Sequence, residues 1–222
     1  MSAERARFEA WLQRRRGRRE PLLEAELLTV VDAYDTAKQG RTLKPEELQL
    51  IADAASDSRA LLWQNAVAFM GVLSEQWPEA NAAILAMAQS RKAHVRFNAL
   101  CCLGESTPFS TVEQVLKSGL RDKSARVRGK AADRMGQLRK LEFVPELTAA
   151  LTNERDPKAR STMEFELRLL RDGYILEPAQ GGGFRVTVHT DDGGLKNAPV
   201  REESLRTKGI GAIASELRRS IL

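Results

Sequence analysis

Three basic side chains in residues 125–138 have the types and spacing needed to bind an anionic surface. Arg126, Lys130 and Arg134 follow one another at intervals of four residues, so in a helix they share one face. Cationic side chains gathered in this way attract phosphate groups or acidic protein surfaces. The formal net charge of +5 agrees with an acidic partner. The alternative is an ordinary charged helix face that meets only solvent.

Residues with catalytic or metal-binding chemistry are few and scattered. The two histidines, His94 and His189, lie in different regions, and neither belongs to a recognisable catalytic motif. Near His189, Asp191 and Asp192 could serve as oxygen ligands, but no further ligand stands at a recognisable spacing. A hairpin end with a turn is the preferred interpretation of that stretch. We therefore expect no enzymatic activity, no metal site and no cofactor.

The middle of the chain contains an internal repeat of 32 or 33 residues. The recurring positions are Val95, Arg96, Ala99 and Gly104 in one copy and Val127, Arg128, Ala131 and Gly136 in the next. Between the copies lies a second helical pattern, in which Pro78 and Pro145 suit a first helical turn. Each unit is therefore predicted to be two short antiparallel helices, and stacking of units buries the apolar faces. The predicted core face of residues 125–138 consists of Val127, Ala131, Met135 and Leu138.

The repeat resembles the HEAT-repeat family in its short bacterial form, and also the HEAT-like repeats of phycobilin lyases. The motif that carries the resemblance is Asp122, then Val127-Arg128, then Ala131-Ala132. By this resemblance, Asp122 and Arg128 form a structural ladder in which the carboxylate holds the guanidinium. Arg128 is accordingly assigned to the fold and not to a ligand.

The resemblance also implies which helices line the concave face of the stack. The helices that carry the Val-Arg pairs would lie there, and stacking would bring equivalent polar positions into a row. That predicted partner-binding row, the basic concave row, consists of His94, Arg126, Lys130, Arg134 and Lys158.

The predicted fold is mostly α: an α-α superhelix, a HEAT-like solenoid, with a small C-terminal β-hairpin and helix. Residues 1–56 are expected to form an N-terminal helical cap of three helices, which carries the Arg run of residues 14–19. Residues 57–172 are expected to form the HEAT-like repeats. Residues 173–222 are expected to form a C-terminal cap, with a hairpin at 174–190 before a last helix.

These features favour a non-catalytic protein-interaction module that binds an acidic partner, such as an adaptor, an assembly factor or a toxin-neutralising partner. The alternative is a nucleic-acid-binding protein, which interleaved acidic residues and the scarcity of base-stacking aromatics disfavour. A HEAT-like DNA glycosylase is less favoured still, because only Trp63 and Asp133 could serve an extruded base. The N-terminus lacks an apolar signal core, and no apolar run is long enough to span a membrane, so we expect a cytoplasmic protein with no membrane partner.

The core assignment generates a stability prediction. Ala131→Leu adds volume where two helices are predicted to meet, so it should lower the free energy of unfolding by about 1–3 kcal/mol. Urea denaturation of the variant and the wild type measures the difference. Equal stability of the two proteins would contradict the assignment of Ala131 to the core.

Overall fold

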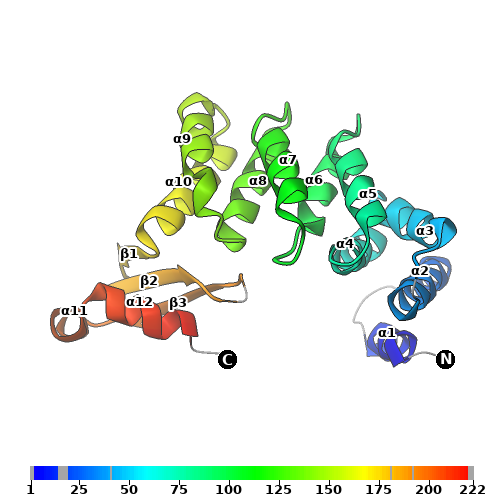
Figure 1. Ribbon diagram of the computed structural model, residues 1–222. Helices are drawn as coiled ribbons and strands as arrows, with labels where there is room; N and C mark the ends of the chain where they lie inside the picture. The colour runs from blue at the N-terminus through cyan, green and yellow to red at the C-terminus, as the bar shows by residue number, and fades with distance from the viewer. Residues whose placement is uncertain (1–2, 15–19, 41, 181, 192, 220–222) are drawn as a thin grey trace. The chain divides into compact units, whose positions relative to one another are not determined.

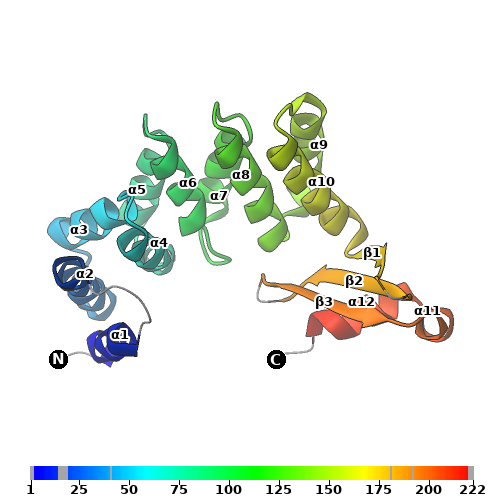
Figure 2. The ribbon, with the colours of Figure 1, turned by 180° about the vertical axis from the view of Figure 1, so that it is seen from behind.

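The computed structural model describes residues 3–14, 20–40, 42–180, 182–191 and 193–219. The chain consists mainly of paired helices, with a small antiparallel sheet near its C-terminus, and the order of its elements can be followed in Figures 1 and 2. It divides into two compact units, residues 1–119 and 120–222. Within the described residues, no helix combines the length and the apolar character needed to cross a membrane.

The first unit consists of helices. They are α1 (Ala3–Arg14), α2 (Pro21–Gln39), α3 (Pro45–Ala55), α4 (Ala60–Ser74), α5 (Pro78–Ala88), α6 (Ala93–Cys102) and α7 (Phe109–Leu120), the last of which ends at the boundary. Proline stands at the start of α2, α3 and α5, where the missing N–H has no intrahelical partner to lose.

The predicted N-terminal cap packs directly on the repeats of the first unit. The rings of Tyr34 in α2 and Phe69 in α4 are stacked, with centroids 4.2 Å apart. Phe8 in α1 meets Phe69 edge-on at 5.7 Å. Because these aromatic contacts bury both elements in one core, the three helices belong to the same unit as the first repeats. Of the Arg run, residues 15–19 lie outside the described residues.

The second unit combines the last repeats with a sheet. Its elements are α8 (Ala125–Gln137), the 3-10 turn η1 (Leu141–Phe143), α9 (Val144–Asn153), α10 (Pro157–Asp172), β1 (Ile175–Pro178), β2 (Phe184–His189), β3 (Leu195–Val200), α11 (Glu202–Lys208) and α12 (Ile210–Arg219). Local signals define α10 well. The Asp156 side chain accepts hydrogen bonds from the backbone N–H groups of Lys158 and Ala159. Gly173, with φ of 77°, ends the helix.

The predicted core face of α8 is confirmed. Val127, Ala131 and Met135 are each at most 1% exposed, whereas Leu138 is half-buried because it follows the helix as its C-cap. On its other side α8 approaches α10 closely. A Cβ atom added to Gly129 would lie 3.5 Å from the Cα atom of Ala159. The small residues of α8 therefore set the distance between the two helices.

The predicted C-terminal hairpin is part of a three-stranded antiparallel sheet with the order β1-β2-β3. Two corrections follow. The turn expected to lead into a helix leads instead into β3, because Gly193 adopts φ of 79° and the Thr190 N–H donates to the Gly194 carbonyl at 2.9 Å. The predicted last helix is α12, and a further short helix, α11, precedes it and ends at Gly209, whose φ is 75°.

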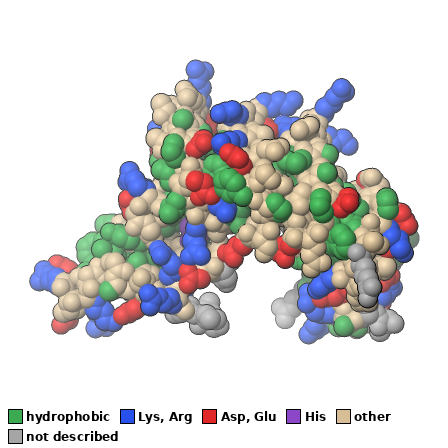
Figure 3. Space-filling view, in the orientation of Figure 1, with side chains coloured by type: hydrophobic (Ala, Val, Ile, Leu, Met, Phe, Trp, Pro, Cys, Tyr) green, Lys and Arg blue, Asp and Glu red, His purple; other side chains and the backbone are tan. Residues whose placement is uncertain are grey.

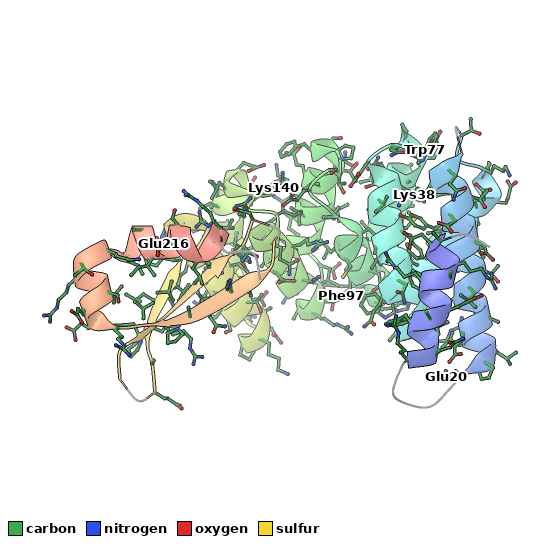
Figure 4. The ribbon with its side chains drawn as sticks, turned by 90° about the horizontal axis from the view of Figure 1, so that it is seen from below. Glu20, Lys38, Trp77, Phe97, Lys140 and Glu216 are labelled. Atoms are coloured by element: carbon green, nitrogen blue, oxygen red, sulfur yellow. The ribbon has the colours of Figure 1, made fainter. Side chains whose placement is uncertain are left out.

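The sheet and α12 form a small core of their own. Val186, Val188 and Val200 are buried together with Ala214 of α12. Figure 4 shows α12, which carries Glu216, lying along the strands. Because a lone hairpin is marginal in water, this apolar layer accounts for the stability of the C-terminal sheet.

A repeated arginine contact ties each repeat turn to its following helix. Arg96 Nη1 donates to the Ser90 carbonyl at 2.8 Å, and Arg128 Nη1 donates to the Asp122 carbonyl at 2.8 Å. Arg160 Nη1 makes the corresponding, longer contact at 3.4 Å with the carbonyl of the residue six positions before it. The shared acceptor is thus a backbone carbonyl, which residues of any type can supply.

The ladder around Arg128 uses a different carboxylate from the predicted one. Arg128 Nε and Nη2 donate to Glu154 Oε2 and Oε1 at 2.6 and 2.7 Å, and the Glu154 side chain is only 1% exposed. The Asp122 carboxylate instead accepts from the Ser124 N–H at 2.7 Å, because the turn before α8 directs it to the backbone. The hydrogen bonds from Arg128 lower the pKa of Glu154 to about 2.

Removing Arg128 should be costly because Glu154 would stay buried without its counter-ion. We expect Arg128→Ala to lower the free energy of unfolding by about 3 kcal/mol, and the added loss from Glu154→Ala to be small. Since the pKa of Glu154 is lowered from 4.5, the coupling should be complete above pH 4.5 and should fall as the pH approaches 2. A double-mutant cycle, followed by urea denaturation at several pH values, measures the coupling free energy between Arg128 and Glu154. Additive losses at pH 7 would contradict the ladder.

Candidate functional site

Two members of the basic concave row lie together at one end of the second unit. Arg126 and Lys158 occupy the second positions of α8 and α10, and both are exposed. The contact between Gly129 and Ala159 holds the first turns of these helices against each other. The two cations are therefore presented by neighbouring helix starts.

Lys130 and Arg134 are held by neighbours on α8. Lys130 Nζ lies 2.7 Å from Asp133 Oδ2, and both side chains are less than one-third exposed. Arg134 Nη1 donates to Gln137 Oε1 at 2.5 Å, and Gln137 Nε2 donates to Asp133 Oδ1 at 2.9 Å. This part of the predicted row is a half-buried hydrogen-bonded network.

His94 belongs to the first unit, where its ring faces the end of another helix. His94 Nε2 lies 3.2 Å from the carbonyl of Ser56, the C-cap of α3. Asn98, one turn further along α6, donates to the Ala55 carbonyl at 2.9 Å. Both side chains complete the C-terminus of α3. The alignment of His94 with Arg126 across the repeats stays a prediction.

The turns before α8 and α10 expose further cations. We call five exposed side chains of the second unit the basic end: Arg121, Lys123, Arg126, Arg155 and Lys158. The Lys and Arg side chains that project from the repeat turns are visible in Figure 3. The helix starts add partial positive charge at the same place, because the first N–H groups of each helix point toward it. Sequence reasoning missed Arg121, Lys123 and Arg155, although each adjoins an acidic residue of a repeat turn.

The acidic residues of these turns are used inside the fold. Asp122 accepts from the Ser124 N–H, Asp156 caps α10, and Glu154 binds Arg128. Their carboxylates therefore contribute to local structure, while the cations beside them face solvent. The electrostatic result is an outward surface on which positive charge prevails.

A second polar cluster lies at the opposite ends of α8 and α10. His189 Nε2 of β2 and Glu166 Oε2 of α10 are 2.8 Å apart, and their side chains are 5% and 3% exposed. A Cβ atom at Gly136 would lie 1.7 Å from Glu166 Oε2 and 2.8 Å from His189 Nε2. Glycine at this position therefore makes room for the pair. Burial raises the pKa of Glu166, and the hydrogen bond with His189 opposes that effect.

His189 thus binds Glu166 and not a cluster of aspartates. Asp191 Oδ1 accepts from Arg139 Nη1 at 2.7 Å, and Asp192 lies outside the described residues. Over the described part of the chain, no three His, Cys, Asp or Glu side chains are grouped as metal ligands. Sequence reasoning missed the Glu166–His189 pair, for which the available signal was a glutamate among the apolar positions of α10, between Met163 and Leu170.

The raised pKa of Glu166 implies a measurable dependence of stability on pH. A carboxyl group whose pKa is raised by folding stabilises most at low pH, and this contribution is lost as the pH rises through the folded-state pKa. Asp133 and Lys130 of α8 and His189 of β2 face this group and set its charge environment. Glu166→Gln removes the titration, so its stability relative to wild type should increase as the pH rises from 4 to 7.

Urea denaturation at a series of pH values compares the two proteins. Asp191→Asn, an exposed change near the same strand end, serves as the control and should keep a constant offset between pH 5 and 7. If the free energy of unfolding of Glu166→Gln falls relative to that of wild type as the pH rises, the raised pKa of Glu166 is contradicted.

Comparison with known families agrees with this architecture. A family model described as HEAT repeats matches residues 81–168, which run from α5 to α10. A search of curated proteins found no match. The two-helix units, the repeated arginine contact and the family match lead to one assignment. Residues 81–168 of this chain carry HEAT repeats.

Proposed function

We propose that this chain is a non-catalytic protein-interaction module that binds an acidic protein surface through the basic end. HEAT repeats generally serve as protein-interaction modules. The observation that carries the proposal is the division of charge in the repeat turns. Their carboxylates are bound within the fold, and their cations point outward.

Charge of one sign on a rigid surface determines which partners approach and how fast they associate. The backbone that presents the basic end is fixed by the Asp156 cap, by the Arg128–Glu154 ion pair and by the close contact of Gly129 with Ala159. The cations therefore need little ordering of the main chain when a partner binds, which limits the entropic cost of association.

The alternative, binding of nucleic acid, would use the same cations on phosphates. Single-stranded partners also require aromatic side chains on which bases stack, and the basic end contains none. Phe143 of the same unit is buried. Trp63, the aromatic residue considered for a glycosylase, packs edge-on against Phe97 at 6.2 Å within the first unit. Asp133, the carboxylate considered for a glycosylase, binds Lys130 and Gln137. These contacts favour a protein partner.

Reversing charge at the basic end should weaken partner binding and leave the fold intact. Arg126→Glu with Lys158→Glu changes two exposed side chains of packed helices, so we expect at least about a tenfold loss of affinity. Lys130 is left unchanged in this test because its ammonium group is paired with Asp133. Partners captured from the source cells by the wild-type chain would be titrated against both proteins by calorimetry.

The matched control is Arg185→Glu with Arg219→Glu, which makes the same charge change at exposed sites outside the basic end. Equal binding of every recovered partner by wild type and by the Arg126 and Lys158 variant would refute the proposal. Mixed-sequence duplex DNA and single-stranded RNA are titrated in parallel at low and near-physiological salt. Binding that survives the higher salt and is lost on charge reversal would establish the nucleic-acid alternative instead.

A further inference from the structure

A cavity of about 450 Å³ lies within the second unit, at the C-terminal end of α10. Its polar wall consists of Arg139, Arg171, Asp172, His189 and Arg218, and its apolar wall includes Leu141 and Leu169. We propose that this cavity binds a small organic acid. The carboxylate would lie against Arg218 and His189, and the apolar body would lie against the leucines.

The charges that line the cavity leave Arg218 without a counter-ion. Arg139 is paired with Asp191 at 2.7 Å, and Arg171 with Asp172 at 2.9 Å. Arg218 Nη2 donates to the Gly173 carbonyl at 2.8 Å, but no carboxylate of the described residues pairs with it. A partly buried guanidinium in this state is stabilised by an anion from outside the chain.

Two buried polar atoms at the cavity also lack hydrogen-bond partners within the described residues. They are Arg218 Nε and His189 Nδ1. Most buried donors and acceptors in proteins are satisfied, and leaving one unsatisfied costs free energy. His189 and Arg218 line the same cavity, and these two atoms are covered from solvent in the structure. We infer that a small movement of the two side chains lets the two oxygens of one carboxylate bind both atoms.

The pairing of His189 with Glu166 determines how the ring can donate. Nε2 faces Glu166 Oε2 at 2.8 Å, so the cavity ligand must use Nδ1. If Glu166 is protonated, its O–H donates to Nε2, and the neutral ring carries its proton on Nδ1. If Glu166 is ionised, Nε2–H donates to it, and only the doubly protonated ring donates through Nδ1. In both cases, a carboxylate in the cavity requires a proton on Nδ1.

The backbone conformation of Arg139 also supports an anion-binding role for the cavity. This residue follows α8 with φ of 48°, a left-handed conformation that glycine usually provides. The Lys140 N–H donates to the Met135 carbonyl at 3.0 Å and thereby closes the helix end around it. An arginine held in this conformation places a guanidinium at the cavity at the expense of local strain.

The size and the apolar wall define the class of acid. A volume of about 450 Å³ lies within the range of small-molecule sites. Leu169 is 4% exposed and Leu141 is 60% exposed, so the wall continues from the interior to the surface. A monocarboxylate with an aliphatic body fits this arrangement. Its source is either a free acid or the carboxyl terminus of a peptide, which share the same chemistry.

Calorimetric titration of the full chain tests the proposal with hexanoate and its neutral counterpart hexanamide. We expect hexanoate to bind at least about tenfold more tightly, because only the carboxylate pairs with Arg218. Arg218→Lys keeps the charge but removes the Nε donor, and it should weaken hexanoate binding about tenfold. Arg219→Lys, the matched control on the exposed neighbouring residue, should bind as wild type does. N-acetyl-leucine, compared with N-acetyl-leucinamide, separates a peptide terminus from a free aliphatic acid as the preferred source.

A second measurement needs no variant at Arg218. The chain has two histidines, so ¹⁵N imidazole spectra are simple, and the His189 signals can be assigned with His94→Gln. With hexanoate bound, the His189 Nδ1 resonance should be that of a protonated nitrogen, whichever state Glu166 has in the free chain. Equal binding of the two probes, no binding of hexanoate, or an unprotonated Nδ1 under saturating hexanoate would each overturn the proposal. Arg218 would then serve only to complete the C-terminus of α10 through Gly173.

Discussion

The buried hydrogen bond between Glu166 and His189 is the contact on which the second unit depends. It joins α10 to the end of β2, and it occupies space that any side chain at position 136 would fill. The sheet therefore docks on the repeat helices only because α8 has glycine there. The turn that follows His189 also lies against α8, since a Cβ atom at Gly193 would be 3.0 Å from the Gln137 carbonyl oxygen. A glutamate buried without this partner would be strongly destabilising, so the hydrogen bond and the docking of the sheet require each other.

The other recurring constraint is the arginine that binds the repeat turn before its helix. Because Arg96 and Arg128 both reach a backbone carbonyl, the contact does not require an acidic side chain at a fixed position. The acidic residues are then available for other local tasks, as Asp122 and Asp156 show by binding backbone N–H groups. Several cationic side chains of these turns and helix starts are exposed beside them. The positive surface of the basic end is thus a consequence of how the repeat turns are stabilised.

The parts of the fold that follow local periodicity could be predicted from the sequence, and the long-range pairings could not. The 32-residue offset and the spacing of small apolar residues led to the helix pairs and to the buried position of Ala131, because helical geometry fixes which side chains share a face. The third strand was missed because Pro199 and the polar residues around it interrupt the alternation typical of strands. The Glu166–His189 pair joins residues 23 positions apart in different elements, and no local pattern encodes such a pairing. Gly136 was recognised from the sequence as a repeat position. The reason why this position has glycine is apparent only from the structure, where the Glu166–His189 pair occupies the space that a side chain would need.

The two proposed sites stand at opposite ends of the same pair of helices, and this separation determines how they can influence each other. Gly129 faces Ala159, and Gly136 faces Glu166, so α8 and α10 run parallel and their starts lie at the same end. With 16 residues, α10 is about 24 Å long. This length is several times the Debye length of about 8 Å at physiological ionic strength, so a carboxylate at Arg218 changes the potential at the basic end very little. Any coupling between an acid in the cavity and a partner at the basic end must therefore pass through the packing of α8 against α10. Gly136 is part of that packing, and the Glu166–His189 pair fills the space beside it.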